Sequence, residues 1–327
     1  MISDLVDPRT IVATLVTVWV TIALVIGIVL VTHAVRVRRA AQRAVLDDRA
    51  RPLVIDFVLD EDDAPAHTET LREATGGMGT SVDERLLAVL NTVTGDARER
   101  IVRMLIARGL PRRLRRATGS WRSHRRARAV LQLGLLGLPE DADLLTRALN
   151  DRAALVRAVA VRALGRHPSP QSAHAILGTI REDRAIPVLV SMNALLDIGH
   201  NPACHRIIRE GLVDASPRVR AASARVLGDL TSAADARRIG ILLDRDPVPS
   251  VQLAAATALR RIGTEINIPQ LLAGTTSSWG PVRLEALRAL LTLPAAATAD
   301  ALAQVRGLHD PVLVPLLDAS ADPRPEV

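Results

Sequence analysis

Apolar residues recur along this chain in a ten-residue pattern that repeats about every 31 residues. The clearest copy is VRAVAVRALG, which begins at Val156, and VRAASARVLG and VRLEALRALL are its closest counterparts. There are six copies, which begin at Arg125, Val156, Val188, Val219, Val251 and Val282 and are separated by 31, 32, 31, 32 and 31 residues. Within each copy the apolar side chains fall on one face of a helix. A period of this length predicts an all-α solenoid in which each repeat is a pair of helices.

The turn before each copy carries a pattern of its own. Five residues before the opening position there is an aspartate or a serine, at Ser120, Asp151, Asp183, Asp214, Asp246 and Ser277. Both residue types accept hydrogen bonds from backbone N–H groups where a helix starts. Proline, which suits the entry to a helix, follows in several of the turns, at Pro187, Pro217, Pro247 and Pro281. The pattern therefore predicts a tight turn between the first and second helix of each pair.

A different pattern occupies the N-terminal part of the chain. Residues 10–34 contain no Asp, Glu or Arg and are almost all apolar or Thr. About 20 such residues suffice to cross a bilayer as a helix, so we predict a single transmembrane helix over residues 10–35 after a short extracytoplasmic leader, residues 1–9. The acidic leader and the absence of an A-x-A-like site argue against a cleaved signal peptide. The arginines that follow, Arg36, Arg38, Arg39 and Arg43, predict a single-pass protein of the cytoplasmic (inner) membrane whose C-terminal domain lies in the cytoplasm.

The pattern is weaker between the apolar run and the repeats. Residues 36–81 are interpreted as a basic juxtamembrane segment followed by an acidic, flexible linker that starts at Asp60, and Pro52 is expected to interrupt the first helix. The short apolar run of residues 52–59 is expected to dock on the repeat domain, with the membrane surface as the alternative. Helical spacing returns at residue 82 and is broken at Gly95. Residues 82–119 are therefore predicted to be atypical N-terminal helices that cap the repeats of residues 120–327.

Positive charge is concentrated in one segment. The chain has 42 basic residues, all of them arginine, and 35 acidic residues, so its net charge is +7. Residues 100–139 hold eleven arginines and no acidic residue, which leaves 31 arginines against 35 acidic residues elsewhere. The candidate basic patch consists of Arg108, Arg112, Arg113, Arg115, Arg116, Arg122, Arg125 and Arg128. Anionic lipid, an acidic protein surface and a solvated face without a partner remain open for it. Nucleic acid is disfavoured because aromatic residues, which stack on bases, make up only 1% of the chain.

The repeats resemble HEAT repeats, and in particular the short bacterial form found in phycobilisome-lyase HEAT-like proteins. The resemblance rests on the aspartate, on Val-Arg five and six residues later and on the period near 31, and it extends from about Ser120 to the C-terminus. It implies a right-handed α-solenoid of HEAT-like helix pairs. In that family Asp and Arg of neighbouring repeats form a ladder, which here would be built from Asp151, Asp183, Asp214 and Asp246 with Arg126, Arg157, Arg220 and Arg283. Leu189 and Gln252 replace the arginine in two repeats, so the ladder is expected to be interrupted.

Every second copy carries an additional arginine at its seventh place. These arginines are Arg162, Arg225 and Arg288, and they recur at intervals of 63 residues. Five residues turn a helix by about 500°, so the two arginines of each copy point about 140° apart. One can serve the ladder while the other faces outward, which makes the three a candidate interaction surface. A solvated face inherited from the duplication of a two-repeat block is the alternative.

The sequence gives no indication of catalysis. Deoxyhypusine hydroxylase, a HEAT-like enzyme, binds iron through His-Glu pairs, and this chain contains no such dipeptide. A phosphate loop that ends in Gly-Lys is excluded because the chain has no lysine. His200, Cys204 and His205 form one cluster of metal-ligand types, for which a capping or packing role is expected. We therefore predict no enzymatic activity, no cofactor and no metal, and the single cysteine rules out an internal disulfide.

These features favour a non-catalytic, membrane-anchored scaffold whose cytoplasmic HEAT solenoid binds a protein partner, which could itself be membrane-bound or act in envelope assembly. The layout of anchor, linker and repeats resembles that of bacterial membrane-anchored HEAT proteins. The alternatives are a HEAT-like enzyme of the lyase or hydroxylase class, and a basic solenoid that binds anionic lipid or nucleic acid.

Overall fold

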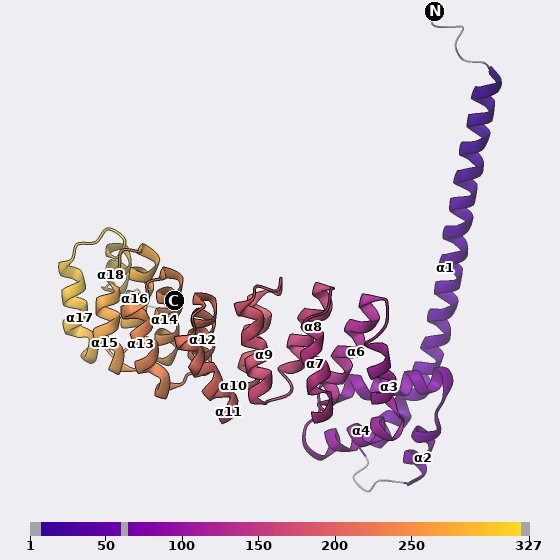
Figure 1. Ribbon diagram of the computed structural model, residues 1–327, viewed down its shortest axis with the longest axis horizontal. Coiled ribbons are helices and arrows are strands. Elements are labelled where there is room, and N and C mark those ends of the chain that lie inside the picture. Colours follow the sequence, from indigo (N-terminus) through magenta and orange to yellow (C-terminus); the bar gives the residue numbers. More distant parts are fainter. Residues whose placement is uncertain (1–7, 60–64, 322–327) are drawn as a thin grey trace, which may run out of the picture. The chain divides into compact units, whose positions relative to one another are not determined.

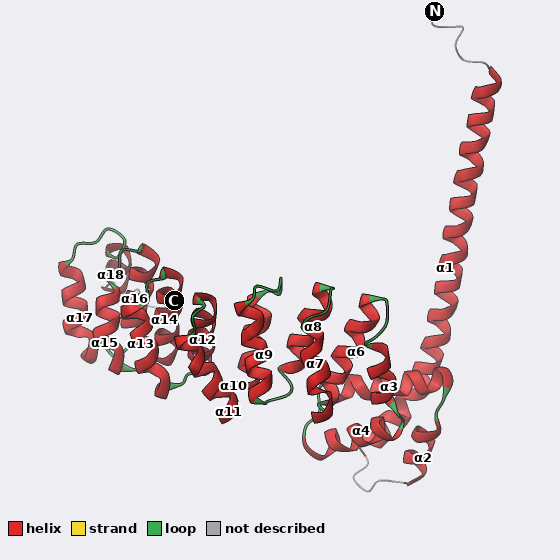
Figure 2. Ribbon diagram, in the orientation of Figure 1, coloured by secondary structure: helices red, strands yellow, loops and turns green. Residues whose placement is uncertain are grey.

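The computed structural model describes residues 8–59 and 65–321, and within these residues it contains helices and no strand (Figure 2). The chain divides into two compact units, Met1–Leu110 (unit 1) and Pro111–Val327 (unit 2). The predicted all-α fold is confirmed. The predicted leader lies largely outside the described residues, and the handedness of the solenoid stays a prediction.

Unit 1 is organised on one long helix, α1 (Pro8–Leu59) (Figure 1). Its segment Val16–Ala34 has a mean hydropathy of 2.3 and no buried residue. Among the described residues this is the one helix long and apolar enough to cross a membrane, although a signal sequence would pass the same test. The remaining helices of the unit are α2 (Pro65–Glu73), α3 (Gly76–Leu90) and α4 (Gly95–Ala107).

The expected helix break at Pro52 is wrong, because α1 continues to Leu59. A proline inside a helix removes a backbone hydrogen bond and clashes with the preceding turn. The side chains of Ala50, Val54 and Phe57 are buried on the same segment, and α1 packs on α2 and α3. Tertiary packing therefore holds the segment helical despite the proline. Residues 52–59 were expected to dock on the repeat domain, and the helix that carries them packs instead on α2 and α3 of unit 1.

The flexible linker predicted up to Ser81 is also wrong for residues 65–81, which form α2 and the start of α3. Residues 60–64 lie outside the described part. The order of the segment depends on Arg108, at the end of α4, whose side chain is 3% exposed. Its guanidinium donates to the carboxylate of Asp83 at 2.6 Å, to the carbonyl of Gly79 at 3.0 Å and to the carbonyl of Leu71. One arginine thus ties α2, α3 and α4 together. The break expected at Gly95 is confirmed.

Unit 2 is a solenoid with two layers of helices (Figure 1). The first helices of the pairs are α5 (Leu110–Ala117, across the unit boundary), α7 (Ala142–Ala148), α9 (Pro170–Arg181), α11 (Pro202–Glu210), α13 (Ala236–Arg245), α15 (Ile268–Gly274) and α17 (Ala295–Gly307). The second helices are α6 (Ser123–Leu136), α8 (Ala154–Leu164), α10 (Val188–Gly199), α12 (Pro217–Asp229), α14 (Pro249–Ile262), α16 (Gly280–Leu291) and α18 (Val314–Ala321). Short 3₁₀ turns precede or follow some first helices: η1 (Pro139–Asp141), η2 (Gly211–Val213), η3 (Ala233–Asp235) and η4 (Glu265–Asn267).

All six predicted copies fall on second helices, α6 to α16, each of which packs on the next. The predicted cap, however, ends earlier than expected, because residues 111–119 belong to the compact unit of the repeats. Arg115 on α5 shows why, since it pairs with Asp141 at the end of η1 at 2.6 Å, within the first repeats.

The glycine that closes several copies sets the spacing of the second helices. A Cβ atom built on Gly134 would lie 2.5 Å from the Cβ of Ala163 on the next second helix, and one on Gly228 would lie 2.6 Å from the Cα of Ala258. Real Cβ contacts are not that short, so only glycine permits this approach. The alanines opposite are fully buried. Glycine and alanine therefore form the points of closest approach between second helices, and aliphatic side chains such as Leu133 and Leu164 fill the remaining space.

Replacing one of these glycines is expected to open the layer. We predict that Gly134→Ala destabilises the protein by about 1–3 kcal/mol, because the added methyl group meets backbone and not a flexible side-chain end. The matched control is Gly178→Ala on α9, where a Cβ atom meets nothing within 4 Å and where the substitution should stabilise by about 0.5 kcal/mol. Urea unfolding of the purified full-length protein measures both, and a Gly134 variant as stable as the control would contradict the packing argument.

Candidate partner-binding groove

The second helices of four consecutive repeats, α10 to α16, line a groove of about 670 Å³ in unit 2. Its lining residues follow the helical repeat, because side chains four residues apart lie on one face. Two residues after the opening valine of the copy come Leu253 on α14 and Leu284 on α16. Six residues after it come Arg225 on α12, Thr257 on α14 and Arg288 on α16. The second helices thus present two adjacent rows of side chains to the groove. The residues two places after the opening valine form the apolar row, and those six places after it form the polar row.

The apolar row continues onto α10 at the start of the groove. Val188 is 41% exposed and Leu189 is 65% exposed, and Met192 follows one turn later. Leu189 stands in the place that the ladder arginine takes in other repeats, so this helix offers the groove an aliphatic side chain instead of a guanidinium.

The charged residues of the groove are only partly neutralised. Glu285, whose side chain is 9% exposed, lies 2.8 Å from Arg260 and 3.5 Å from Arg288. Arg261 pairs with Asp229. Among the described residues no ion pair is formed by Arg225. Four arginines against two carboxylates leave the groove with a positive excess.

The third arginine of the candidate interaction surface, Arg162, lies outside this groove. It lines a neighbouring pocket of about 420 Å³ between α8 and α10, together with Arg166, Asn193 and Asp197. Burial raises the pKa of Asp197, against the opposing effect of Arg166 and Arg162. The structure therefore brings Arg225 and Arg288 together in one groove and places Arg162 in the next pocket along the second layer.

The predicted ladder is present at two junctions, and a third junction joins a predicted arginine to an aspartate that was not predicted. Arg126 donates to both oxygens of Asp151, each at 2.8 Å, and Arg220 donates to Asp246 at 2.6 and 3.0 Å. Arg283 pairs with Asp310 at 2.7 Å. Each arginine also donates backwards, at 2.9 Å, to the carbonyl of the Asp or Ser of its own turn, which is Ser120, Asp214 or Ser277. The guanidinium thus joins consecutive turns by clamping one carbonyl and one carboxylate.

Asp310 was not predicted as a ladder residue. Asp310-Pro311-Val312 repeats the sequence Asp246-Pro247-Val248, which could have identified it. In both turns the aspartate also accepts from the backbone N–H two residues later, at 2.8 Å from Val312 and 3.0 Å from Val248.

The ladder differs from the prediction at Asp183 and Asp214. Arg157 donates to the carbonyl of Arg184 at 2.9 Å and not to Asp183, which pairs instead with Arg218. The cause is the irregular turn, in which Asp183 and Ala185 have positive φ values of 48° and 53°. Asp214 is held by Arg181 of α9, a first helix, since Leu189 has no donor to offer.

The second predicted interruption, at Gln252, is only partial. The Gln252 amide donates to the carbonyl of Asp246 at 2.8 Å, as an arginine would, and its carbonyl accepts from the hydroxyl of Ser277 at 3.3 Å. At Gln252 the ladder is therefore continuous in hydrogen bonds but carries no charge, and at Leu189 it stays interrupted.

The ladder carboxylates are stabilised in their charged form. Hydrogen bonds from Arg126 lower the pKa of Asp151, and those from Arg181 lower the pKa of Asp214, in both cases against a smaller effect of burial. A carboxyl group whose pKa is lower in the folded chain binds fewer protons there than in the unfolded chain. The pairs therefore contribute their stability at neutral pH and lose it as the pH falls below the ordinary carboxyl range.

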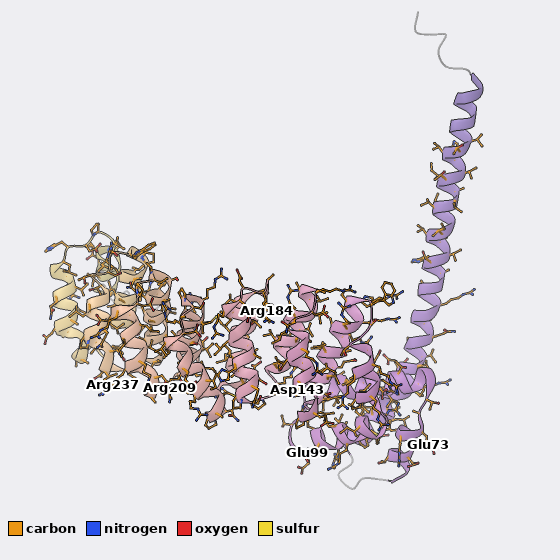
Figure 3. All side chains as sticks on the ribbon, viewed as in Figure 1. Glu73, Glu99, Asp143, Arg184, Arg209 and Arg237 are labelled. Carbon is orange, nitrogen blue, oxygen red and sulfur yellow. The ribbon has the colours of Figure 1, made fainter. Side chains whose placement is uncertain are left out.

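The first helices contain a second periodic position that sequence reasoning missed. A small polar residue or cysteine, at most 1% exposed, lies near the start of each first helix from α7 to α17, at Asp141, Ser172, Cys204, Asp235, Asn267 and Thr298. Asp235 accepts from Ser232 at 2.6 Å, lies 2.7 Å from the imidazole of His205 and pairs with Arg209. Figure 3 shows Arg209 on the lower edge of the unit and Arg184 on the upper edge.

This position explains the cluster of His200, Cys204 and His205. Cys204 is a buried core residue, and burial raises the pKa of its thiol. His205 holds Asp235, and His200 is exposed. In the described part of the chain no three His, Cys, Asp or Glu side chains are placed to hold a metal ion.

The candidate basic patch is not one surface. Arg108 is buried in unit 1, and Arg115 is engaged with Asp141 and Glu140. The remaining members lie exposed on α5, on α6 and in the turn between them, where Arg122 also stacks over the ring of Trp121 at 4.6 Å. Arg108 and Arg115 thus stabilise the fold through ion pairs. That the other six arginines bind lipid or an acidic protein stays a prediction. Of the arginines predicted to set the topology, Arg36, Arg38, Arg39 and Arg43 all lie on α1.

Known proteins share this architecture. Residues 206–291 match the model of the family described as HEAT repeats. The crystal structure of a mutant of Kap121p is similar with a TM-score of 0.53 and 14% identity over 82% of this chain and 33% of Kap121p, so this chain spans about a third of that protein. Human deoxyhypusine hydroxylase (TM-score 0.29, 19% identity, 66% of this chain and 99% of that chain) and the CpcE–CpcF complex of phycocyanin lyase from Nostoc (0.31, 20%, 71% and 94%) are too distant to support an argument. A search of curated protein sequences gives no match.

The clamp of the ladder predicts a measurable cost when its charge is removed. In Arg220→Gln the amide can keep the bond to the carbonyl of Asp214, as Gln252 does in its own repeat, but Asp246, 3% exposed, loses its cation. We expect a loss of about 1.5–3 kcal/mol in the free energy of unfolding at pH 7. The control is Arg245→Gln, whose pair with Asp244 is largely exposed and should cost at most about 0.5 kcal/mol. Equal losses in the two variants would refute the clamp.

Proposed function

We propose that this chain, which is a HEAT-repeat protein, is a non-catalytic scaffold that is held at a membrane by α1 and binds a protein partner through its solenoid. The observation that carries the proposal is the groove over α10 to α16, where an apolar row and partly unneutralised arginines face solvent together. Solenoids present extended surfaces of this kind to other proteins. The partner is proposed to be a protein that reaches the solenoid at the membrane surface, either from the same membrane or from the cytoplasm.

The anchoring part of the proposal rests on α1. Its apolar segment, Val16–Ala34, continues without a break into the part of the helix in which Ala50, Val54 and Phe57 are buried in unit 1. A cleaved signal sequence would have to be cut within or beside this helix. The arginines of residues 36–43 lie directly after the apolar segment. By the positive-inside rule these arginines support a single pass through the cytoplasmic (inner) membrane with the C-terminal repeats in the cytoplasm.

Retention of α1 can be tested directly. We expect the protein expressed from its full coding sequence to stay in the membrane pellet after alkaline carbonate extraction, and its intact mass to include the apolar segment. A soluble form that begins after residue 34 would show that the segment is a signal sequence and would remove the anchor from the proposal.

The scaffold proposal is tested by photo-crosslinking in native membranes. A photo-reactive amino acid in place of Leu189, which is 65% exposed at the groove, should give a discrete adduct with one protein. The control places it at Ile241, which is 56% exposed on the first helix α13, away from the groove, and should give none. If both positions give the same adducts or neither gives any, binding through the groove is rejected. Stoichiometric iron or zinc in the purified protein would favour the enzyme alternative instead.

A further inference from the structure

We propose that the groove over α10 to α16 takes an extended, acidic segment of the partner protein in which apolar and carboxylate side chains alternate. This inference rests on the scaffold function and adds the chemistry of the ligand. It is argued from the apolar row, from the arginines that lack full neutralisation and from the distance between them.

The apolar row selects aliphatic or aromatic side chains. Leu189, Leu253 and Leu284 come from α10, α14 and α16, and Met192 and Pro281 complete the wall. Apolar side chains that cover this wall remove its exposed area, including the 65% exposure of Leu189, from water. Because the row crosses three second helices, its ligand must run along the solenoid, across the helices.

The arginine row selects carboxylates. Arg225 forms no ion pair among the described residues, and Arg288 has a single carboxylate, Glu285, at 3.5 Å, which Arg260 holds more closely at 2.8 Å. Glu285 therefore cannot neutralise both Arg260 and Arg288, so Arg288 keeps part of its positive charge. Arginine binds a carboxylate through two parallel N–H donors, which makes an incoming Asp or Glu the best complement to Arg225 and Arg288. A basic segment would be repelled, and a neutral one would leave the positive excess in place.

The spacing favours an extended conformation. Arg225 and Arg288 lie on α12 and α16, with α14 between them. Packed helices are about 8–10 Å apart, so the two guanidinium groups are roughly 20 Å apart along the solenoid. An extended segment covers that distance in about six residues, and its successive side chains point to opposite sides. An extended segment can therefore direct every second side chain toward the apolar row and the others toward the arginines. The two rows lie four residues apart on the second helices, one on each side of such a segment.

The test uses the full-length protein in nanodiscs of phosphatidylcholine and three fluorescein-labelled, end-capped ten-residue peptides. In the first peptide leucine and glutamate alternate; in the second glutamine replaces glutamate, and in the third arginine does. Fluorescence anisotropy at low salt should show binding of the glutamate peptide, at least tenfold weaker binding of the glutamine peptide and no binding of the arginine peptide. Binding of the glutamate peptide should weaken as salt is raised.

Variants locate the binding to the groove. Arg225→Glu with Arg288→Glu should weaken binding of the glutamate peptide at least tenfold, and Leu189→Asn, which removes apolar surface without adding a charge, should also weaken it. The control is Arg237→Glu with Arg238→Glu, on exposed positions of the first helix α13, where Figure 3 shows Arg237 on the lower edge of the unit. The control should change binding by less than twofold. Thermal unfolding checks that each variant is folded, and Leu189→Asn still locates binding to the groove if the double variant does not fold.

The outcomes separate the inference from the scaffold function. If the glutamine peptide binds as well as the glutamate peptide, or the control pair weakens binding as much as the groove pair, the acidic-segment inference is wrong. If photo-crosslinking at position 189 captures a partner through a neutral or basic segment, the scaffold stands and the inference fails. If nanodiscs with anionic lipid, but not neutral ones, abolish peptide binding, the groove takes lipid headgroups and the inference is again overturned.

Discussion

The close approach of successive second helices is the constraint on which the rest of unit 2 depends. Gly134 and Gly228 meet backbone atoms of the next second helix at distances that leave no room for a Cβ atom. This contact fixes how near the second helices lie, and hence where their outward-facing rows come together to line the groove. The composition follows from it, since a layer closed by Gly and Ala contacts has little space for aromatic side chains. A groove between second helices is therefore a consequence of packing, and its chemistry is set by the residues that packing leaves outside.

Hydrogen bonds in the turns complement this packing. The ladder arginines connect a carbonyl of one turn to a carboxylate of the next, and the carboxylate in turn accepts from its own helix start. The ladder loses charge at Leu189 and Gln252, and Leu189 is also a lining residue of the groove. The loss of stability at Leu189 is reduced by Arg181, which lies on a first helix and pairs with Asp214 in place of the missing ladder arginine. Departures from a repeat pattern that are compensated nearby are expected where a surface has another role.

The sequence predicted what is periodic and failed where order comes from distant contacts. The 31-residue period located all six second helices, because each copy carries its own helix-forming and capping residues. Pro52 and residues 65–81 were misjudged because their conformation depends on packing and on Arg108, which lies far away in the chain. Arg225 and Arg288 could be singled out by their spacing, but their shared groove could not, since it needs the side chains of α10 and α14 as well. Asp310 was missed although its turn repeats that of Asp246.

The continuity of α1 gives the anchor and the first core a common element. About twelve residues separate Ala34, the end of the apolar segment, from Leu46, against which Gly77 of α3 packs closely. At 1.5 Å per residue a helix of that length is roughly 18 Å long. In an anchored protein this fixes the distance between the bilayer and the core of unit 1, because a helix, unlike a flexible linker, does not shorten or extend. A truncation that extended past Val54 would remove Ala50 and Val54 from that core, so the helix that carries the apolar segment is also part of the folded body.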